Sequence, residues 1–543
     1  MPPSPSPRTP ASAPPLRDRG DACPGALRLH SAADGRLARV RIPAGDLTVR
    51  QAAALAEAAD RLGDGSLSLT SRGNVELRGL SDDCGGPLAA LLHDAGLLPS
   101  ARHERIRNIL ASPLAGLDRH TPADVRLWAR SLDALLCASA SATALSGRFL
   151  FVLDDGRGDV AALGGDVSLV AEAAAADAGD GTPSSALLRV GDDPAALRIA
   201  GADAARAALT AAEAFLAAAE ASGSGAWRVR ELPDGHRLNA PAVAEALRSA
   251  GIEAAYVPEP PPGPHLGTED VPEAPGAHLA TECVPTEAAG PDLATEHVPM
   301  TAGPRRSAGD SATPGIVEGA DGRRALSVLA PLGRLTTAQW RLLTTLADRD
   351  GSGALRLTPW RGIVLPGLSA ATAGNRLAEL SDAGLITDPS SPWFRLSACT
   401  GRPGCAKSLT DVRADAATAV ASAGRIPGGA RGERAPGEPA PGGPTALVPI
   451  PAPGTPLPGT PVHWSGCARR CGHPHGTWTD VLATADGYQV TAVGPGTPPP
   501  TPGVTPDTPP APPPAAPDAP PSTPDVPPAT PDAPPAPQET RPQ

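Results

Sequence analysis

An internal duplication constrains the fold of this chain more than any other feature. Residues 47–116 align with residues 335–404 without a gap at an offset of 288, with 25 identities in 70 positions. Each copy reads as a helix, a short alternating strand, a turn, a second strand and a helix, and the first helix begins at Thr48 or Thr336. The sequence therefore predicts a two-layer α/β unit that is present twice.

Segments rich in proline and glycine separate the duplicated parts. The 543 residues include 59 glycines and 69 prolines, many of them in stretches without large apolar residues. Such stretches cannot bury enough apolar surface to fold, so we predict that they are disordered. The predicted organisation is a disordered lead 1–19, a half-domain 20–99, an α/β domain 100–257, a low-complexity linker 258–315, a second half-domain 316–387, a second α/β domain 388–494 with a disordered insert 424–460, and a Pro-rich disordered tail 495–543.

The charge and hydropathy of the chain exclude several classes of protein. The formal net charge of -12 and the pI near 5.4 argue against a general nucleic-acid binder, which needs a basic face for phosphates. No run of eighteen apolar residues predicts a membrane span, and the Pro/Ser-rich start has no apolar core of a secretory signal. We therefore expect a cytoplasmic protein, in which paired cysteines bind metal or do redox chemistry more often than they form disulfides.

Four of the eight cysteines form two tight pairs, Cys399-x5-Cys405 and Cys467-x3-Cys471. Four thiolates can hold a [4Fe–4S] cluster, one for each iron. Zinc also takes four cysteines, but its structural sites usually space each pair by two to four residues, and the first pair falls outside that range. From the residues alone, an iron–sulfur site is favoured, while zinc, a disulfide and chance remain open.

Arginines form the second group of candidate site residues. Strand alternation places Arg72, Asn74, Glu76 and Arg78 on one face, and Arg105, Arg107 and Arg148 follow in "RHERIRNILASPLAG" and "LSGRFLFVLDDG". Several arginines on one face would suit a ligand with many carboxylates.

The two copies differ in complementary ways. At the offset of 288, Cys399 aligns with Ala111 and Cys405 with Leu117, whereas Arg72 aligns with Trp360. One copy has the cysteines and the other has the arginine. This complementarity predicts one composite site between the two halves.

The order of these motifs resembles that of a known superfamily. "SLTSRGNVELRG", "RNILASPLAG" and "LSGRFLFVLDDG", followed by the two cysteine pairs, look like the sulfite/nitrite reductases over a span from about Cys23 to about Val493. "GDACPGALRLH" and "LRLTPWRGIVLPG" are similar to the precorrin-3B synthase family within it. The resemblance implies an α+β fold with two ferredoxin-like half-domains and two reductase-type α/β domains in pseudo-twofold arrangement.

The resemblance also implies a cofactor and roles for individual residues. It implies a [4Fe–4S] cluster on Cys399, Cys405, Cys467 and Cys471, the last of which bridges to sirohaem in the reductases. Arg72, Arg107 and Arg148 would be catalytic and would bind the substrate, together with Asn74 and Arg78. The reductases have a second lysine where this chain has Leu150, and the loss of that cation favours a tetrapyrrole substrate over a small anion.

The implied reaction is the hydroxylation of precorrin-3A at C20 with γ-lactone formation, in aerobic cobalamin biosynthesis. It uses O2, NADH-derived electrons passing through the cluster, and an additional non-haem iron whose ligands the sequence does not reveal. There is no G-x-G-x-x-G after a strand, so we expect a separate reductase or ferredoxin as electron donor. The alternatives are a sirohaem-dependent sulfite or nitrite reductase and a zinc-stabilised binding protein without a redox role.

Overall fold

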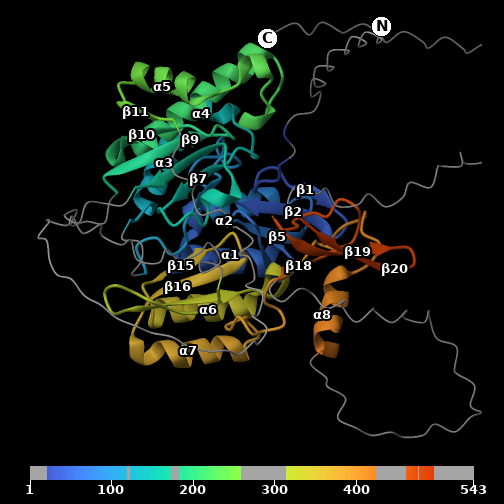
Figure 1. Ribbon diagram of the computed structural model, residues 1–543. Helices are drawn as coiled ribbons and strands as arrows, with labels where there is room; N and C mark the ends of the chain where they lie inside the picture. Colours follow the sequence, from blue (N-terminus) through green and yellow to red (C-terminus); the bar gives the residue numbers. More distant parts are fainter. Residues whose placement is uncertain are drawn as a thin grey trace, which may run out of the picture. The chain divides into compact units, whose positions relative to one another are not determined.

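The computed structural model describes residues 21, 23–118, 123–172, 183–258, 313–423, 460–474 and 476–494 (Figure 1). Apart from a few residues at their ends, the predicted lead, linker, insert and tail lie outside these described residues. In the described ranges, each helix is too short or too polar to cross a membrane.

Two half-domains of the same element order form the duplicated core. The first consists of β1 (His30–Ala32), β2 (Gly35–Val40), β3 (Asp46–Thr48), α1 (Val49–Leu62), β4 (Ser66–Leu69), β5 (Val75–Leu80) and α2 (Gly85–Asp94). The second consists of β12 (Gly315–Glu318), β13 (Arg324–Leu329), β14 (Arg334–Thr336), α6 (Thr337–Arg349), β15 (Ala354–Leu357), β16 (Gly362–Leu368) and α7 (Ala370–Asp382).

The predicted starts of the first helices are confirmed by their caps. The Thr48 side chain accepts a hydrogen bond from the backbone N–H of Gln51, and Gln51 Oε1 accepts one from the backbone N–H of Thr48. Thr336 and Gln339 repeat this capping box in the second copy. Each box satisfies backbone N–H groups that a helix start otherwise leaves without partners.

The two half-domains exchange a strand with each other. One five-stranded sheet has the order β1-β2-β5-β4-β14, and the other has the order β12-β13-β16-β15-β3. Each sheet therefore ends on a three-residue strand from the opposite half, with Leu335 paired to Leu67 and Leu355 paired to Leu47. Helices α1 and α6 pack together, and the buried indole N–H of Trp340 donates a 2.7 Å hydrogen bond to the Ala52 carbonyl. The halves thus form one continuous platform.

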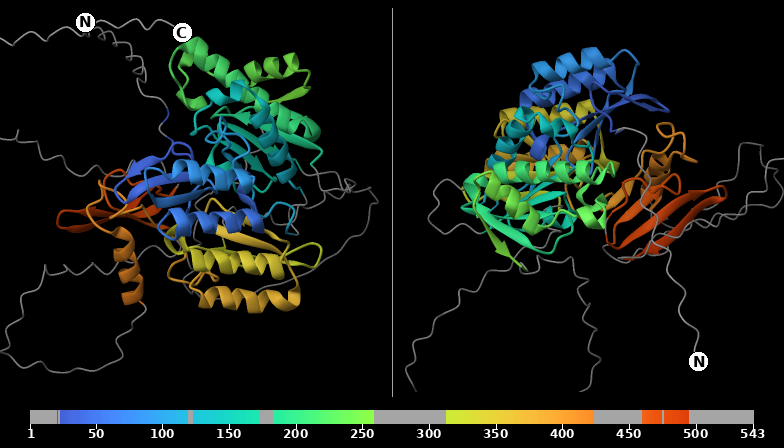
Figure 2. Two further views of the ribbon diagram at one scale, coloured as in Figure 1. Left: turned by 180° about the vertical axis from the view of Figure 1, so that it is seen from behind. Right: turned by 90° about the horizontal axis from the view of Figure 1, so that it is seen from above.

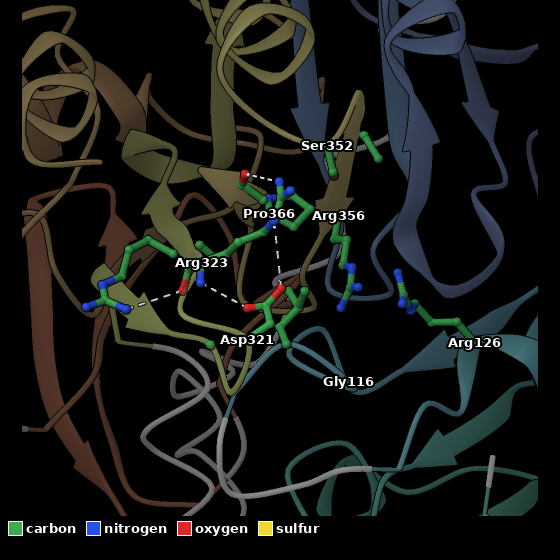
Figure 3. A pocket seen from close by; sticks show the side chains of 13 residues that line it. Gly116, Arg126, Asp321, Arg323, Ser352, Arg356 and Pro366 are labelled. Carbon is green, nitrogen blue, oxygen red and sulfur yellow. Dashed lines mark hydrogen bonds and ion pairs between the residues drawn. The ribbon is translucent and has the colours of Figure 1, made fainter. Parts of the chain in front are cut away.

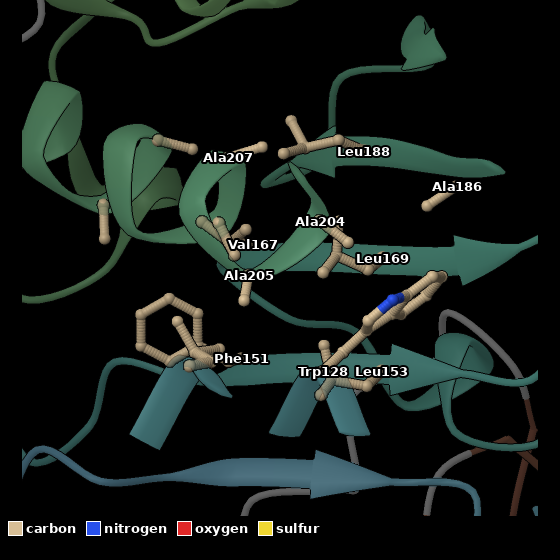
Figure 4. Close-up of a cluster of buried hydrophobic side chains, with 14 of the residues drawn as sticks. Trp128, Phe151, Leu153, Val167, Leu169, Ala186, Leu188, Ala204, Ala205 and Ala207 are labelled. Carbon is tan, nitrogen blue, oxygen red and sulfur yellow. The ribbon is translucent and has the colours of Figure 1, made fainter. Parts of the chain in front are cut away.

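The first α/β domain contains a six-stranded mixed sheet. Its elements are β6 (Ile109–Ala111), α3 (Arg126–Ala138), β7 (Phe151–Asp154), β8 (Val167–Ala171), β9 (Ser185–Val190), β10 (Ala196–Ala200), α4 (Ala204–Ser222), α5 (Ala240–Ser249) and β11 (Ala254–Val257). Strands β6, β7 and β8 run parallel, and the remaining three continue antiparallel. Helix α4 packs on β8 and β9 (Figure 2). The alanine-rich face of α4 meets Phe151, Val167 and Leu169 in the core between them (Figure 4).

The second α/β domain repeats the first in shorter form. It contains β17 (Leu396–Ala398), α8 (Val412–Ala423), β18 (Val462–Ser465), β19 (Trp478–Thr484) and β20 (Gly487–Val493). Again three parallel strands are followed by an antiparallel one. The predicted α+β fold with an internally duplicated architecture is confirmed.

Candidate functional site: the cysteine loops and the basic group

The four cysteines of the two pairs converge at one edge of the second α/β domain. Cys399 directly follows β17 and Cys467 follows β18 by two residues. Because these neighbouring strands are parallel, their carboxyl ends lie at the same edge of the sheet. Burial raises the pKa of the Cys471 thiol, and the negative charges of the other three cysteines raise it further. All four are free thiols, and Cys471 is the exposed one.

The loops around these cysteines are closely packed. The Gly466 N–H donates a 3.3 Å hydrogen bond to Cys399 Sγ, which ties the two cysteine loops together. A Cβ atom on Gly466 would lie only 1.8 Å from Ser408 Oγ, so no other residue fits there. The loops therefore present sulfur atoms on a tightly constrained backbone.

The spacing of the sulfurs fits a [4Fe–4S] cluster better than zinc. A tetrahedral zinc ion with bonds of about 2.3 Å would hold its sulfurs roughly 3.8 Å apart. Among the described residues, no three of the cysteine sulfurs lie within 4.8 Å of one another. A [4Fe–4S] cluster takes one thiolate for each iron and does not require its sulfurs to lie so close together. When bound, such a cluster would supply one-electron transfer.

The first α/β domain has a serine where the second has its first cysteine. Ser112 donates its backbone N–H to the Leu153 carbonyl, as Cys399 does to the Trp464 carbonyl. The Asp155 N–H donates to Ser112 Oγ over 3.2 Å, in the way that Gly466 donates to Cys399 Sγ. The alignment of Cys399 with Ala111 is therefore wrong by one residue, because the offset between the two copies changes from 288 to 287 before β6 and β17 begin.

A buried ionic network occupies this equivalent place in the first α/β domain. Asp154, Asp155 and Asp159 form the one group of three potential metal ligands found within the described ranges. Arg157 pairs with Asp155 at 2.6 Å and with Asp118 at 2.8 Å. The Asp154 carboxylate accepts backbone N–H groups from its own turn. The guanidinium of Arg157 thus takes the place of a metal ion.

Three arginines donate to carbonyl groups of the cysteine loops. Arg78 pairs with Asp34 through two 2.9 Å hydrogen bonds and donates a 2.8 Å hydrogen bond to the Gly404 carbonyl. Arg413 donates to the Cys399 carbonyl over 3.1 Å, and Arg361 to the Gly472 carbonyl over 3.2 Å. Burial and the charges of Arg334, Arg361 and Arg78 lower the pKa of Arg413 to about 10. The loops are therefore held in a strongly positive environment.

A second cluster of cations, here called the basic group, consists of Arg39, Arg41, Arg72 and Arg228. Arg41 is 2% exposed and donates Nε–H to the Arg105 carbonyl over 3.1 Å. Its Nη1 and Nη2 atoms are buried without a hydrogen-bond partner among the described residues. Burial, Arg39 and Arg72 lower the pKa of Arg41 to about 9, and burial with Arg228 and Arg39 lowers that of Arg72 to about 10.

The basic group adjoins the cysteine loops. Burial lowers the pKa of both Arg41 and Arg361, and the charge of Glu76, which accepts a hydrogen bond from Arg39, partly opposes that lowering at both. The same strand carries Arg78, which reaches the Gly404 carbonyl. Together these contacts define a positively charged surface beside the cysteine loops, in which Arg39 pairs with Glu76 and Arg228 with Asp166.

The structure directs several of the predicted site residues to other partners. Arg107 is buried and makes two 2.6 Å hydrogen bonds to Asp133 and a third to the Leu97 carbonyl, so its guanidinium is fully engaged. Asn74 is 2% exposed and accepts the Ile42 N–H. Arg148 is exposed and lies over the Trp227 ring at 4.7 Å. The predicted set is thus divided: Arg72 and Arg78 lie at the site, whereas Asn74 and Arg107 are held by structural partners.

The histidines near the cysteine loops form no ligand set. His463 is buried, with Nδ1 at 2.8 Å from Ser397 Oγ, and burial lowers its pKa to about 3, so it is neutral. His473 stacks on Trp478. His475 lies outside the described residues.

Sequence reasoning did not select Arg39, Arg41, Arg361 or Arg413. Arg39 and Arg41 are two residues apart in "RVR", so strand alternation places both on one face. This alternation was a signal by which they could have been found. Arg361 lies in the motif "LRLTPWRGIVLPG", but it aligns with Gly73 in the first copy, so the comparison of the two copies did not mark it as a shared basic position.

Comparisons with known proteins agree with this architecture. Residues 30–95 and 317–383 each match the nitrite/sulfite reductase ferredoxin-like half domain. A stretch of 138 residues, 25% of this chain, is 37% identical to a precorrin-3B synthase of Sinorhizobium sp., of which it covers 29%. Another of 127 residues, 22% of the chain, is 35% identical to the ferredoxin–nitrite reductase of Synechococcus elongatus, of which it covers 25%. The matches thus span less than a third of these curated relatives.

The fold is similar to that of the NirA protein of Mycobacterium tuberculosis. The TM-score is 0.55 at 16% sequence identity, over 84% of this chain and 74% of that one. The two half-domain matches and this fold thus agree in showing two ferredoxin-like half-domains on a NirA-like fold. The sequence of the chain is similar to a precorrin-3B synthase and to nitrite reductases.

Proposed function

We propose that this chain is an oxidoreductase of the precorrin-3B synthase type. The reaction is the hydroxylation of precorrin-3A at C20, with closure of a γ-lactone. One atom of O2 enters the product and the other leaves as water, with two electrons and two protons supplied by the donor. NADH is the ultimate electron source in this proposal, and a separate reductase or ferredoxin delivers the electrons to the cluster.

The observation that carries this proposal is the state of Arg41. A buried guanidinium with two nitrogen atoms that lack partners has a large unmet need for acceptors. Arg72, beside it, is half-buried and shares the same lack of neutralisation. The peripheral carboxylates of a tetrapyrrole would supply those acceptors through charge-assisted hydrogen bonds. The role of these arginines is to bind and orient the macrocycle beside the cysteine loops.

The surroundings of Leu150 support a tetrapyrrole as substrate. Leu150 is 5% exposed and packs with Val152, Val160 and the partly buried Trp360. An apolar contact at this place does not stabilise a small anion during reduction, whereas it can support a large ring. The second iron of the proposal has no assigned ligands: the one group of three potential metal ligands in the described ranges, Asp154, Asp155 and Asp159, is paired with Arg157 and with backbone N–H groups.

The alternative is a sirohaem-dependent sulfite or nitrite reductase. Its support is the exposure of Cys471 beyond the other three cysteines, since that residue would have to reach the sirohaem iron. For both functions we propose a cytoplasmic location, because reduced thiols are stable in a reducing compartment.

The test begins with the protein purified anaerobically. We expect a brown protein without sirohaem bands in the red, which on incubation with precorrin-3A, a reductant and 18O2 yields a product that has gained one labelled oxygen atom. Sirohaem bands and nitrite-dependent reoxidation of a reduced dye would establish the alternative. A folded, colourless, iron-free protein would exclude both.

Two variants connect the reaction to the basic group. Arg72→Gln should weaken tetrapyrrole binding without loss of the cluster spectrum. The matched control is Arg341→Gln, because Arg341 is an exposed arginine paired with Asp60 on the platform helices. Equal binding by the two variants would contradict the proposed role of the basic group.

A further inference from the structure

An arginine-lined cavity lies apart from the cysteine loops, beside the second half-domain. Its volume is about 310 Å³, close to the lower limit of small-molecule sites. The lining includes Gly116 and Leu117 after β6 and, from the charged residues, Arg126, Arg323, Arg324 and Arg356 with the single acid Asp321. Figure 3 shows the guanidinium groups of Arg126 and Arg356 facing one another at the cavity. In a chain with a net charge of -12, this concentration of cations is local and distinct.

The duplication explains where this cavity comes from. "DVR" occurs at 124–126 and 411–413, so Arg126 is the counterpart of Arg413, which holds the Cys399 carbonyl. Gly116 and Gly404 lie in the loops that follow β6 and β17, the first strands of the two α/β domains. The cysteine loops of the second α/β domain meet the first half-domain at Arg78, and this contact is here called the junction. The cavity is the equivalent place between the first α/β domain and the second half-domain.

One substitution leaves this equivalent place open. "ADGR" occurs at 33–36 and 320–323, so Asp321 stands where Asp34 does in the first copy. Asp34 is neutralised by Arg78, which also closes that junction by reaching Gly404. In the second copy Pro366 replaces Arg78, and no long side chain fills the space.

Arg126, Arg323 and Arg324 each pair with a carboxylate, those of Asp124, Asp321 and Glu318, whereas Arg356 is incompletely neutralised. Arg356 is 2% exposed, and its Nε atom has no hydrogen-bond partner among the residues that the structure describes. Its Nη1 donates to the carbonyls of Pro113 and Ala115, and its nearest paired carboxylate, that of Asp46, is 3.9 Å away. The Arg126 guanidinium donates two hydrogen bonds to the Asp124 carboxylate, but its positive charge still faces that of Arg356. A buried cation in this state favours an added anion.

We propose that this cavity is a binding site for a small oxyanion with two or more negative charges, either a phosphate or a di- or tricarboxylate. The anion lies between Arg126 and Arg356, and Arg323 at the rim adds a third cation. The site is independent of the proposed reaction. Its residues come from the second half-domain and the first α/β domain, whereas the cysteine loops of the second α/β domain contact Arg78 of the first half-domain.

Isothermal titration calorimetry of the full-length protein tests the site with inorganic phosphate and, in a separate arm, citrate. We expect one of the two to bind at one site per chain with a Kd on the order of 1 mM or tighter. Arg126→Gln should weaken that binding by about 10-fold or more, because it removes a charge-assisted contact. Binding of phosphate alone assigns a phosphoryl ligand, and binding of citrate alone assigns a carboxylate ligand.

Pro366→Arg provides a second, opposite perturbation. It places an arginine beside Asp321, as Arg78 lies beside Asp34, and should abolish anion binding by filling the cavity. Arg72→Gln is the control, because an anion bound at the basic group would be lost in that variant and retained in the other two. The proposal is overturned if neither anion binds, or if binding is lost in Arg72→Gln and unchanged in Arg126→Gln and Pro366→Arg.

Discussion

Replacing Arg41 by methionine should stabilise the ligand-free protein and weaken its binding of a tetrapyrrole. Burial lowers the pKa of Arg41 from 12.5 to about 9, so keeping the charge in the folded state costs free energy at neutral pH. At about 1.4 kcal/mol for each pH unit, the difference corresponds to an upper bound of roughly 5 kcal/mol. Methionine fills a similar apolar volume and carries no charge.

Part of that gain is lost with the hydrogen bond that Arg41 does make. The Nε–H group donates to the Arg105 carbonyl, and a hydrogen bond from a charged group is worth about 1.5–3 kcal/mol. The net expectation is a stabilisation of about 2 kcal/mol, or a rise in Tm of roughly 3–5 °C. The sign follows from linkage: the cost is complete below pH 9 and is relieved only as the pH rises through about 9 toward 12.5.

Differential scanning calorimetry at pH 7.5 measures the first effect, and fluorescence titration with uroporphyrin, a polycarboxylate tetrapyrrole, measures the second. We expect Arg41→Met to bind at least about 10-fold more weakly than the parent. Arg341→Met, at an exposed ion pair, should change neither quantity appreciably. A Tm that falls in Arg41→Met, together with unchanged binding, would refute the assignment of Arg41 as a residue that sacrifices stability for ligand binding.

Three further predictions concern the cluster, the platform and the ionic network. Cys405→Ser should abolish the electron paramagnetic resonance signal of the reduced cluster, and an unchanged signal would contradict its role as a ligand. Trp340→Ala should lower the unfolding free energy by about 3–5 kcal/mol in urea titration, because it removes a fully buried indole and its bond to Ala52; a loss below 1 kcal/mol, on the order of a surface substitution, would argue against the shared core. Burial and the neighbouring carboxylates raise the pKa of Asp159 to about 7, so the free energy of unfolding should fall as the pH rises from 4 to 7. Asp159→Asn should flatten that profile and stabilise the protein at pH 8. A profile that stays as steep would show that another group titrates.

The local part of the structure followed from the sequence. The duplication predicted the repeated helix and strand order, and Thr48 and Thr336 marked the helix starts, because caps and alternation act over a few residues. The resemblance predicted two ferredoxin-like half-domains and the fold, and the two half-domain matches and the NirA likeness bear both out.

The parts that the sequence did not reveal depend on contacts between distant residues. The exchanged strands β3 and β14 are three residues long, too short for an alternation pattern, and their partners come from the other half. Arg78 contacts Gly404 across 326 positions. Arg107 seemed equivalent to Arg72 in the sequence, and only the position of Asp133 on α3 separates them. Charge type can be read from a sequence, but the partner that neutralises it cannot.

The exchange of β3 and β14 has a consequence for the presence of both copies in one chain. A single copy of the half-domain has an edge on β4 or β15 that it cannot cover with its own strands, and exposed edges invite pairing with a second chain. A separate half-domain of this kind would therefore be complete only as a symmetric pair, and the two copies in one chain satisfy this requirement by sharing their sheets. In one chain, the two equivalent faces of the platform can differ in sequence. One face has the cysteines and a junction closed by Arg78, and the other has Pro366 and an open cavity. A symmetric pair of identical half-domains could not have the asymmetry that makes one composite site possible.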